Sequence, residues 1–369
     1  MKGGGETMRI GVLTGGGDCP GLNAVIRAIT RSGLYRGDKI FGFKDGFKGL
    51  IENRYISLNH DSVSGILARG GTILGTTNRD NPFKFKQIIE GKEVFVDMSE
   101  VIKENYNSLG LDCLVVIGGD GSMRLANEIS ARTDIKIIGV PKTIDNDIVG
   151  TEMTFGFNTA VDVATQALDR LHTTAESHHR VMILEVMGRD AGWIALHAGM
   201  AGGADIILIP EIPYTLEVIN KTIQERIARG KNFSLIIVAE GVKNLTGDQI
   251  IQSGIPKDIF NIPRLGGISN WLAKIIEDYT GIESRATILG HLQRGGSPNS
   301  FDRVFATQLG AKAAELAADE RFGEMVALRD NKIVSIPLEE VKGIRLVSLE
   351  DPLVKTCREI GLSFGEGQK

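Results

Sequence analysis

The sequence has few cysteines and no long apolar run. Its three cysteines, Cys19, Cys113 and Cys357, are odd in number and widely spaced, so they form neither a disulfide framework nor a zinc-binding pattern. That usage favours a reducing compartment. No stretch reaches the length of a membrane-spanning helix, and residues 1–13 contain no apolar core of a signal peptide. We therefore expect a cytoplasmic protein without a membrane partner.

The sequence also lacks a surplus of positive charge. Its 42 Lys and Arg residues are fewer than its 46 Asp and Glu residues, which gives a formal net charge of −4. A nucleic-acid-binding domain normally carries a basic surface, so we expect no nucleic-acid partner. Phosphorylated small molecules remain compatible with this charge, because a local group of arginines is enough to bind them. Glycine, by contrast, is abundant, and its 46 residues concentrate in the loops expected between strands and helices.

The most informative stretch is residues 113–147. Two apolar runs, 113–117 and 135–140, stand on either side of a segment of helical length. This spacing predicts a βαβ unit in which each strand ends in a polar loop, at 118–122 and at 141–147. In an open α/β sheet, ligands bind outside the carboxyl ends of the strands, so the two loops should face one site.

The composition of these two loops indicates phosphoryl transfer. Three glycines in the first loop let backbone N–H groups approach a phosphate, and the helix expected to begin at Ser122 points its positive end there. Asp120 stands among these donors, where a carboxylate is best explained as a Mg²⁺ ligand. The second loop adds a cation, a hydroxyl and two carboxylates: Lys142, Thr143, Asp145 and Asp147. Together these groups predict transfer of a phosphoryl group to a hydroxyl.

The rest of the chain repeats the β-α-β order, which predicts an α/β protein with two doubly wound units. Strands are expected at 9–14, 39–43, 181–186, 206–209, 234–239 and 283–289, and in a hairpin at 324–329 and 332–336. Helices are expected up to about Tyr35 and at 158–174, 216–228, 266–279 and 301–318.

Four motifs, in this order, resemble those of the 6-phosphofructokinase family: GGDGS at 118–122, PKTIDND at 141–147, MGR at 187–189 and GHLQRGGSP at 290–298. GGGDCPGLNA at 15–24 resembles the family's first nucleotide loop, and most of the chain continues the match. The resemblance implies two Rossmann-like three-layer sandwich domains with the active site between them. The larger, donor-binding domain would comprise 1–156 and 293–343, and the smaller, sugar-phosphate-binding domain 157–292 and 344–369.

The resemblance also implies the reaction, which is transfer of the γ-phosphoryl group of ATP to the 1-hydroxyl of D-fructose 6-phosphate in glycolysis. Asp145 would accept the hydroxyl proton, Thr143 would bond the moving phosphoryl group, and Asp147 would hold metal-bound water. Arg189 would stabilise the developing charge. The residues expected at ATP and Mg²⁺ are Gly17, Arg79, Gly119, Asp120, Gly121 and Ser122, with Asn78 as the alternative to Arg79.

Arginines should dominate the site for the sugar phosphate, because the planar guanidinium binds phosphate oxygens in pairs. The residues that the resemblance places there are Arg180, Met187, Gly188, Glu240, Arg285, His291 and Arg294, together with Thr143, Asp145 and Arg189. The family brings Arg180 across a subunit interface, and Arg285 is a further candidate for that role. We therefore expect a homo-oligomer, either a dimer or a tetramer.

Two positions bear on the phosphoryl donor. Pyrophosphate-using members of the family typically have aspartate at the position of Gly121 and lysine at the position of Lys142, whereas most bacterial ATP-using members have glycine at both. This chain combines Gly121 with Lys142. The glycine leaves room for a nucleotide and the lysine excludes nothing, so the pair favours ATP.

Three other functions stay open. The nearest is a pyrophosphate-dependent enzyme, diphosphate–fructose-6-phosphate 1-phosphotransferase. A lipid or NAD kinase would share the GGDG loop but gives no reason for MGR and GHLQRGGSP. A catalytically inactive sugar-phosphate sensor or regulatory subunit would not need Asp120, Asp145 and Arg189 all intact.

Overall fold

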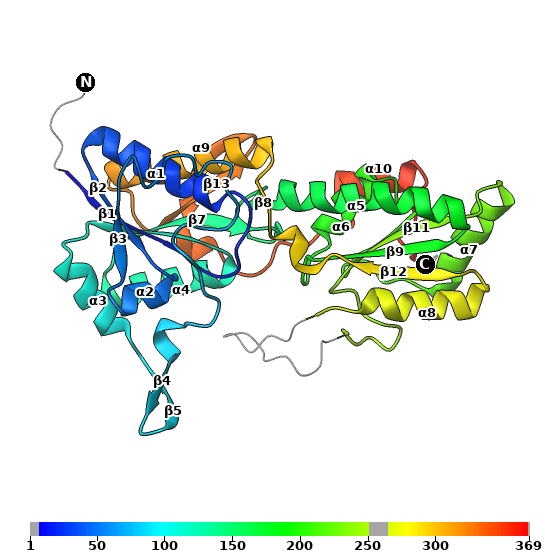
Figure 1. Ribbon diagram of the computed structural model, residues 1–369, viewed down its shortest axis with the longest axis horizontal. Coiled ribbons are helices and arrows are strands. Elements are labelled where there is room, and N and C mark those ends of the chain that lie inside the picture. Colours follow the sequence, from blue (N-terminus) through cyan, green and yellow to red (C-terminus); the bar gives the residue numbers. More distant parts are fainter. Residues whose placement is uncertain (1–6, 251–264, 368–369) are drawn as a thin grey trace.

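The computed structural model describes residues 7–250 and 265–367, and it has two lobes, each built on its own sheet (Figure 1). The lobes lie side by side, and the chain crosses between them several times. A two-stranded hairpin, β4 (Phe85–Ile89) and β5 (Lys92–Val96), protrudes from the first lobe. Within the described residues, no helix is both long and apolar enough to span a bilayer.

The first lobe contains an eight-stranded mixed sheet in the order β14-β13-β7-β6-β1-β2-β3, with β8 paired to β7. The central strands are parallel, and β3 and β14 are antiparallel edge strands. All six residues of β6 are buried, because α1 and α9 cover one face of the sheet and α3 and α4 the other (Figure 1). The strands are β1 (Arg9–Thr14), β2 (Lys39–Phe43), β3 (Tyr55–Leu58), β6 (Cys113–Gly118), β7 (Ile137–Thr143), β8 (Phe155–Gly156), β13 (Glu324–Arg329) and β14 (Lys332–Pro337); the helices are α1 (Leu22–Arg36), α2 (Phe47–Ile51), α3 (Ser99–Ser108), α4 (Asp120–Thr133) and α9 (Ser300–Ala318).

The second lobe contains a four-stranded, fully parallel sheet in the order β10-β11-β9-β12. Because the strands are parallel, their carboxyl ends share one edge, and that edge faces the first lobe. The strands are β9 (Val181–Val186), β10 (Ile206–Leu208), β11 (Ser234–Ala239) and β12 (Ser284–Ile288); the helices are α5 (Phe157–His178), α6 (Trp193–Ala201), α7 (Leu216–Ala228), α8 (Ile268–Thr280) and α10 (Pro352–Glu359).

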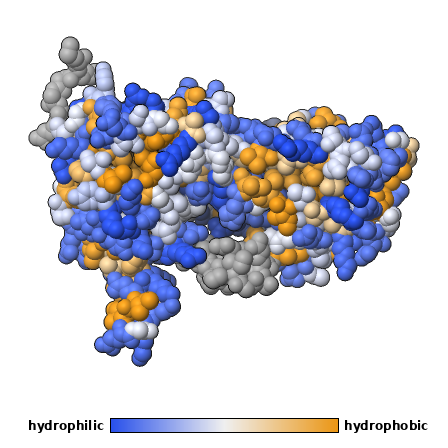
Figure 2. Space-filling view, viewed as in Figure 1, coloured by the Kyte–Doolittle hydropathy of each residue, from blue (hydrophilic) through white to orange (hydrophobic). Residues whose placement is uncertain are grey.

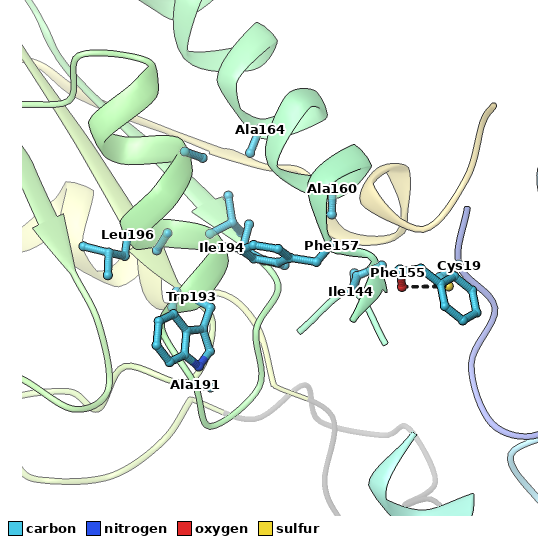
Figure 3. Packing of buried hydrophobic residues seen from close by; sticks show 14 of the residues in the cluster. Cys19, Ile144, Phe155, Phe157, Ala160, Ala164, Ala191, Trp193, Ile194 and Leu196 are labelled. Carbon is cyan, nitrogen blue, oxygen red and sulfur yellow. Dashed lines mark hydrogen bonds between the residues drawn. The ribbon is translucent and has the colours of Figure 1, made fainter. Parts of the chain in front are cut away.

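One hydrophobic core runs through both lobes at the start of α5. The side chain of Phe157 lies between Ile144 of the first lobe and Ile194 of the second (Figure 3). Its ring also meets the His197 ring edge-on, with the centroids 5.1 Å apart. This shared packing connects the carboxyl end of β7 with α6, so the two lobes are not independent at this point.

The expected doubly wound α/β architecture is confirmed, and several elements have the predicted bounds. Two bounds at the site were wrong in detail: α4 begins at Asp120 and not at Ser122, and β7 runs to Thr143, so residues 141–143 belong to the strand and not to the loop. Gly119 is extended, with φ −79° and ψ −171°, so the chain enters the helix directly after it. Asp120 thus occupies the first helical turn, where the helix dipole favours a carboxylate. The domain boundaries at 156, 292 and 343 stay a prediction.

The protruding hairpin was not predicted. Glu90 and Gly91, with φ 52° and 75°, form the two-residue turn between its strands. Two of its apolar side chains are largely exposed, Ile88 at 73% and Phe95 at 65%. Figure 2 shows hydrophobic surface on this protrusion.

Candidate active site

A cleft of 640 Å³ lies between the lobes, and its walls come from the carboxyl ends of strands in both sheets. This is the edge at which open α/β sheets bind ligands. It brings together most of the residues expected from the sequence: Gly17, Gly119, Asp120, Gly121, Ser122, Lys142, Thr143, Asp145, Asp147, Met187, Arg189, Glu240, His291 and Arg294.

The two glycine loops of the first lobe pack directly against each other. A Cβ atom added to Gly15 would lie 2.8 Å from Ser122 Oγ, and one added to Gly118 would overlap Ser122. At Gly17 an added Cβ would lie 2.8 Å from Nη1 of Arg294. A side chain at Gly118 is therefore excluded, whereas the contacts at Gly15 and Gly17 are with the ends of movable side chains. Such a close approach of the backbone is typical of a phosphate site.

Lys142 holds the first of these loops in place. Its side chain is 3% exposed, and its ammonium group donates to the backbone carbonyl of Gly17. Burial lowers the pKa of Lys142. The lysine thus supports residues 15–17 as well as lining the cleft, a role that the sequence did not indicate.

The loop after β7 fixes the Asp145 carboxylate with one oxygen left over. The Thr143 hydroxyl donates to Asp145 Oδ2 at 3.2 Å and accepts from the Asp145 backbone N–H at 3.0 Å. Asn146 turns the chain with φ 54°, and its side-chain oxygen accepts from the Thr154 N–H at 3.0 Å. Asp145 Oδ1 is buried and has no hydrogen-bond partner among the described residues. That oxygen is free to accept a proton from a ligand in the cleft.

Several carboxylates crowd this part of the cleft. Burial, followed by the charges of Asp145 and Asp120, raises the pKa of Asp147 to about 8. Burial and the Asp145 charge likewise raise the pKa of Glu240 to about 8. Such a cluster is relieved by a cation, and oxygen ligands suit Mg²⁺.

The cluster does not form a complete metal site by itself. Within residues 7–250 and 265–367, no three Asp, Glu, His or Cys side chains are placed to hold a metal ion. Mg²⁺ is commonly held by one or two carboxylates together with substrate phosphates. Asp120, at the amino end of α4 beside the glycine loop, fits that arrangement. Asp147 is close enough for the charge of Asp120 to raise its pKa.

The second lobe contributes a strained turn at Met187–Arg189. Gly188 has φ 145° and Arg189 has φ 56°, and the Arg189 N–H donates to Glu240 Oε1 at 3.4 Å. A non-glycine residue in this conformation is uncommon and often marks a functional site. The Met187 N–H donates to Oε1 of Gln293 at 2.8 Å. Gln293, which is fully buried, was missed in the sequence, although it lies inside the GHLQRGGSP motif.

Four residues expected at the site do not line the cleft: Arg79, Gly188, Arg180 and Arg285. Arg79 is exposed, whereas its neighbours Asn78 and Asp80 are part of the cleft wall. Gly188 contributes the turn and not the wall. Residues that the sequence did not single out also line this cleft, among them Phe47, Thr76, Thr77, Arg124 and Leu125.

Arg180 and Arg285 lie at the opposite end of the small sheet, at the amino ends of β9 and β12. Both form ion pairs with Glu283, which lies 2.7 Å from Arg180 Nε, and Arg285 also pairs with Glu277 at 3.3 Å. The cleft lies at the carboxyl ends of the same strands, so these arginines do not reach it within one chain.

Comparisons with known proteins agree with these features. The phosphofructokinase family model matches residues 9–317. ATP-dependent 6-phosphofructokinase 2 of Clostridium perfringens is 52% identical over 362 residues, covering 97% of this chain and 98% of the relative. ATP-dependent 6-phosphofructokinase 1 of Synechocystis sp. is 48% identical and covers 98% of this chain and 99% of the relative. Pyrophosphate–fructose 6-phosphate 1-phosphotransferase of Streptomyces coelicolor is 46% identical, with 97% and 100% covered.

Solved structures show the same fold. The Pichia pastoris phosphofructokinase in the T-state is 31% identical, with a TM-score of 0.77 over 92% of this chain, and this chain spans 36% of the Pichia chain. A pyrophosphate-dependent phosphofructokinase from Marinobacter aquaeolei has a TM-score of 0.78 at 21% identity, covering 98% of this chain and 92% of its own. On its sequence, its fold and the contents of its cleft, the chain belongs to the phosphofructokinase family.

Proposed function

We propose that this chain is an ATP-dependent 6-phosphofructokinase, which converts D-fructose 6-phosphate and ATP into fructose 1,6-bisphosphate and ADP. The observation that carries the proposal is the unpartnered, buried Oδ1 of Asp145 in the same cleft as the glycine loop at 118–122. A proton acceptor and a phosphate-binding loop at that position are what transfer to a hydroxyl requires. The names of the Clostridium and Synechocystis relatives support ATP as the donor.

In this mechanism Asp145 removes the proton from the 1-hydroxyl of the sugar. Thr143 holds Oδ2, so Oδ1 receives the proton while the sugar oxygen bonds to the γ-phosphorus and the bond from that phosphorus to ADP breaks. Arg189 and the backbone N–H groups of residues 118–122 stabilise the charge that builds up on the transferring group. Thr143, which also lines the cleft, would bond an oxygen of the moving phosphoryl group.

We propose Asp120 as the principal protein ligand for Mg²⁺, with Asp147 on the same side of the cleft. When bound, Mg²⁺ would neutralise charge on the donor phosphates. Asp120 also sits in the first turn of α4, where the helix dipole favours a carboxylate. Gly17, Gly119, Gly121 and Ser122 would hold the phosphates through backbone and hydroxyl donors.

The sugar phosphate would lie against the second lobe. Glu240 would accept hydrogen bonds from sugar hydroxyls, and His291 and Arg294 would bind the 6-phosphate. Arg294 already reaches the first lobe, where its Nη1 donates to the backbone carbonyl of Asp18 at 3.3 Å. Arg294 would therefore connect the site of the 6-phosphate with the first glycine loop, through the backbone of Asp18.

We further propose that a second copy of the chain completes the phosphate site. Arg180 and Arg285 cannot serve the cleft of their own chain, so a role at the 6-phosphate requires a homo-oligomer that presents them to a neighbour. Dimer and tetramer both satisfy this requirement. Sedimentation velocity at the assay concentration tests it, because a fully active monomer would exclude any such role.

Use of pyrophosphate is the second candidate, favoured by Lys142 and by the name of the Streptomyces relative. Gly121 is buried at the cleft wall and adds no side chain against a nucleotide, which favours ATP. The deciding experiment supplies the purified chain with fructose 6-phosphate, Mg²⁺ and either ATP or pyrophosphate. Product formed with pyrophosphate alone would refute ATP dependence, and no product with either donor would indicate a sugar-phosphate sensor.

We place the enzyme in the cytoplasm. All three cysteines are free and buried, as expected for a protein that does not depend on an oxidising compartment. Fractionation of producing cells with a compartment marker tests this assignment.

A further inference from the structure

A short crossover segment, residues 344–347, runs along the loop that carries Asp145. Ile344 forms an isolated antiparallel bridge with Ile148, and the Arg345 N–H donates to the Asp147 carbonyl at 2.8 Å. The segment continues from the first lobe toward α10 in the second lobe. Its backbone is therefore attached directly to the catalytic loop of one lobe on its way to the other.

The side chain of Arg345 joins that loop to α6. Its Nη1 donates to the backbone carbonyl of Asn146 at 2.9 Å, and its guanidinium carbon lies 4.0 Å from the ring centroid of Trp193. Trp193 Nε1 in turn donates to the Arg345 carbonyl at 2.9 Å. Trp193 is 4% exposed and is the first residue of α6. The arginine thus bonds to the first lobe and stacks on the second.

Glu211 fixes the same segment to the turn that carries Arg189. Its carboxylate accepts from the Gly192 N–H at 3.0 Å and from the Val347 N–H at 2.9 Å. Gly192 ends the turn that begins at Met187. The Asp145 loop, the crossover segment and the Arg189 turn are therefore linked by consecutive hydrogen bonds, with Arg345 at the junction.

We propose that Arg345 is a positioning residue that sets the spacing between Asp145 on the first lobe and Arg189 on the second. The inference rests on the proposed function, because that function assigns roles to both residues. Arg345 itself is not among the residues that line the cleft. Misplacement of reacting groups by about 1 Å can cost roughly 100-fold in rate, so a residue at this junction controls turnover without contacting substrate.

The test is Arg345→Met, which keeps an unbranched side chain over Trp193 and removes the charge and the donors. We expect kcat to fall by about 10- to 100-fold, with the KM for fructose 6-phosphate and for ATP within about threefold of wild type. Arg345→Lys keeps one donor and the charge, so it should recover part of kcat. A folding check by thermal unfolding accompanies each variant.

Arg358→Met is the matched control. Arg358 also stacks on an aromatic ring, that of Phe364 at 5.6 Å, and pairs with Glu366, but these contacts stay within the second lobe. Its kcat should equal that of wild type. A folded Arg345→Met enzyme with kcat within twofold of wild type would overturn the proposal, and so would an equal loss in Arg358→Met.

If Arg345→Met does not fold, Trp193→Phe carries the test, because it keeps an aromatic ring and removes the donor to the Arg345 carbonyl. A several-fold lower kcat at unchanged KM supports the proposal, and a wild-type kcat overturns it. Amide hydrogen exchange in residues 145–148 gives a readout that needs no turnover: it should accelerate in Arg345→Met or Trp193→Phe, and unchanged exchange contradicts the inference. Wild type that is inactive with both donors would refute the proposed function separately.

Discussion

Asp145→Asn is the substitution for which the structure makes the most detailed prediction. The amide has the size of the carboxylate, and its oxygen can still accept from the Thr143 hydroxyl, so the loop should keep its shape. What disappears is the negative charge and the free oxygen that would take the sugar proton. Loss of a general base typically costs about 10²- to 10⁴-fold, so kcat should fall by at least about 100-fold while the KM for fructose 6-phosphate stays within a few-fold.

The same substitution should change how stability depends on pH. In the ligand-free wild type, Asp147 and Glu240 have pKa values raised to about 8, from ordinary values of 3.8 and 4.5. The folded state therefore binds more protons than the unfolded chain between about pH 4 and pH 8, and stability must fall as the pH rises through that window. Asp145 is a cause of both raised values, ranking after burial. Asparagine should therefore lower both pKa values and flatten the decline.

The size of this effect follows from the linkage between pKa and free energy. Each unit by which the pKa of a carboxyl falls in the folded state adds about 1.4 kcal/mol to the free energy of unfolding, at a pH above both the original and the lowered pKa. A drop of about one unit at either carboxyl would thus raise the free energy of unfolding of the variant, relative to wild type, by roughly 1–2 kcal/mol at pH 8. No such gain is expected near pH 5, where both carboxyls are protonated in the folded state of either protein. Urea unfolding of metal-free wild type and variant at the two pH values measures it.

Two results would refute this reasoning. A variant with kcat within tenfold of wild type would remove Asp145 from the role of base. A difference in unfolding free energy that is the same at pH 5 and pH 8 would show that Asp145 does not govern the charge of its two neighbours. Glu217→Gln, in the exposed first turn of α7, is a suitable control for the loss of one carboxylate away from the cleft.

Three further substitutions test the donor and sugar-phosphate assignments. Gly121→Asp adds a carboxylate beside the donor phosphates, and a repulsion of about 2–4 kcal/mol should lower kcat/KM for ATP roughly 30- to 1000-fold while sparing pyrophosphate; equal ATP use by variant and wild type would place donor selection elsewhere. Arg294→Ala should raise the KM for fructose 6-phosphate at least about tenfold with a smaller change in kcat, because ground state and transition state share that contact. A large loss in kcat with an unchanged KM would contradict the assignment. Lys142→Met removes the bond to the Gly17 carbonyl and should raise the KM for ATP several-fold, measured by ATP titration; if only the use of pyrophosphate declines, Lys142 acts on that donor and not on the loop.

The parts of the fold that could be predicted are those whose cause is local. β1, β9 and β11 are apolar runs buried on both faces between polar loops, and their predicted and observed bounds coincide. α6 was missed because it is apolar nearly all round, so it shows no amphipathic period. The β4–β5 hairpin did have a signal, the dipeptide Glu90-Gly91 between two alternating runs, and this signal was overlooked.

The candidate active site likewise has features that could be predicted from the sequence and features that could not. Asp120, Asp145 and Arg189 could be predicted because each stands in a short motif at the end of a strand, and the rule for open α/β sheets places such loops together. The left-handed conformation of Arg189 could not be predicted, since nothing in the tripeptide MGR requires it. Its hydrogen bond from the backbone N–H goes to Glu240, which is 51 residues away.

The contacts that hold the catalytic loops relative to one another are the least predictable part, and the reason is their range. Gln293 is 106 residues from Met187, and Arg345 is 199 residues from Asn146. Each bonds to a backbone group, so the sequence of its partner carries no complementary side chain that could reveal the pair. An arginine such as Arg345, beside no motif, reads as a surface residue until the fold brings Asn146 and Trp193 to it. In an enzyme whose site lies between two lobes, such residues decide how the motifs meet, and substitution of Arg345 tests whether that spacing limits turnover.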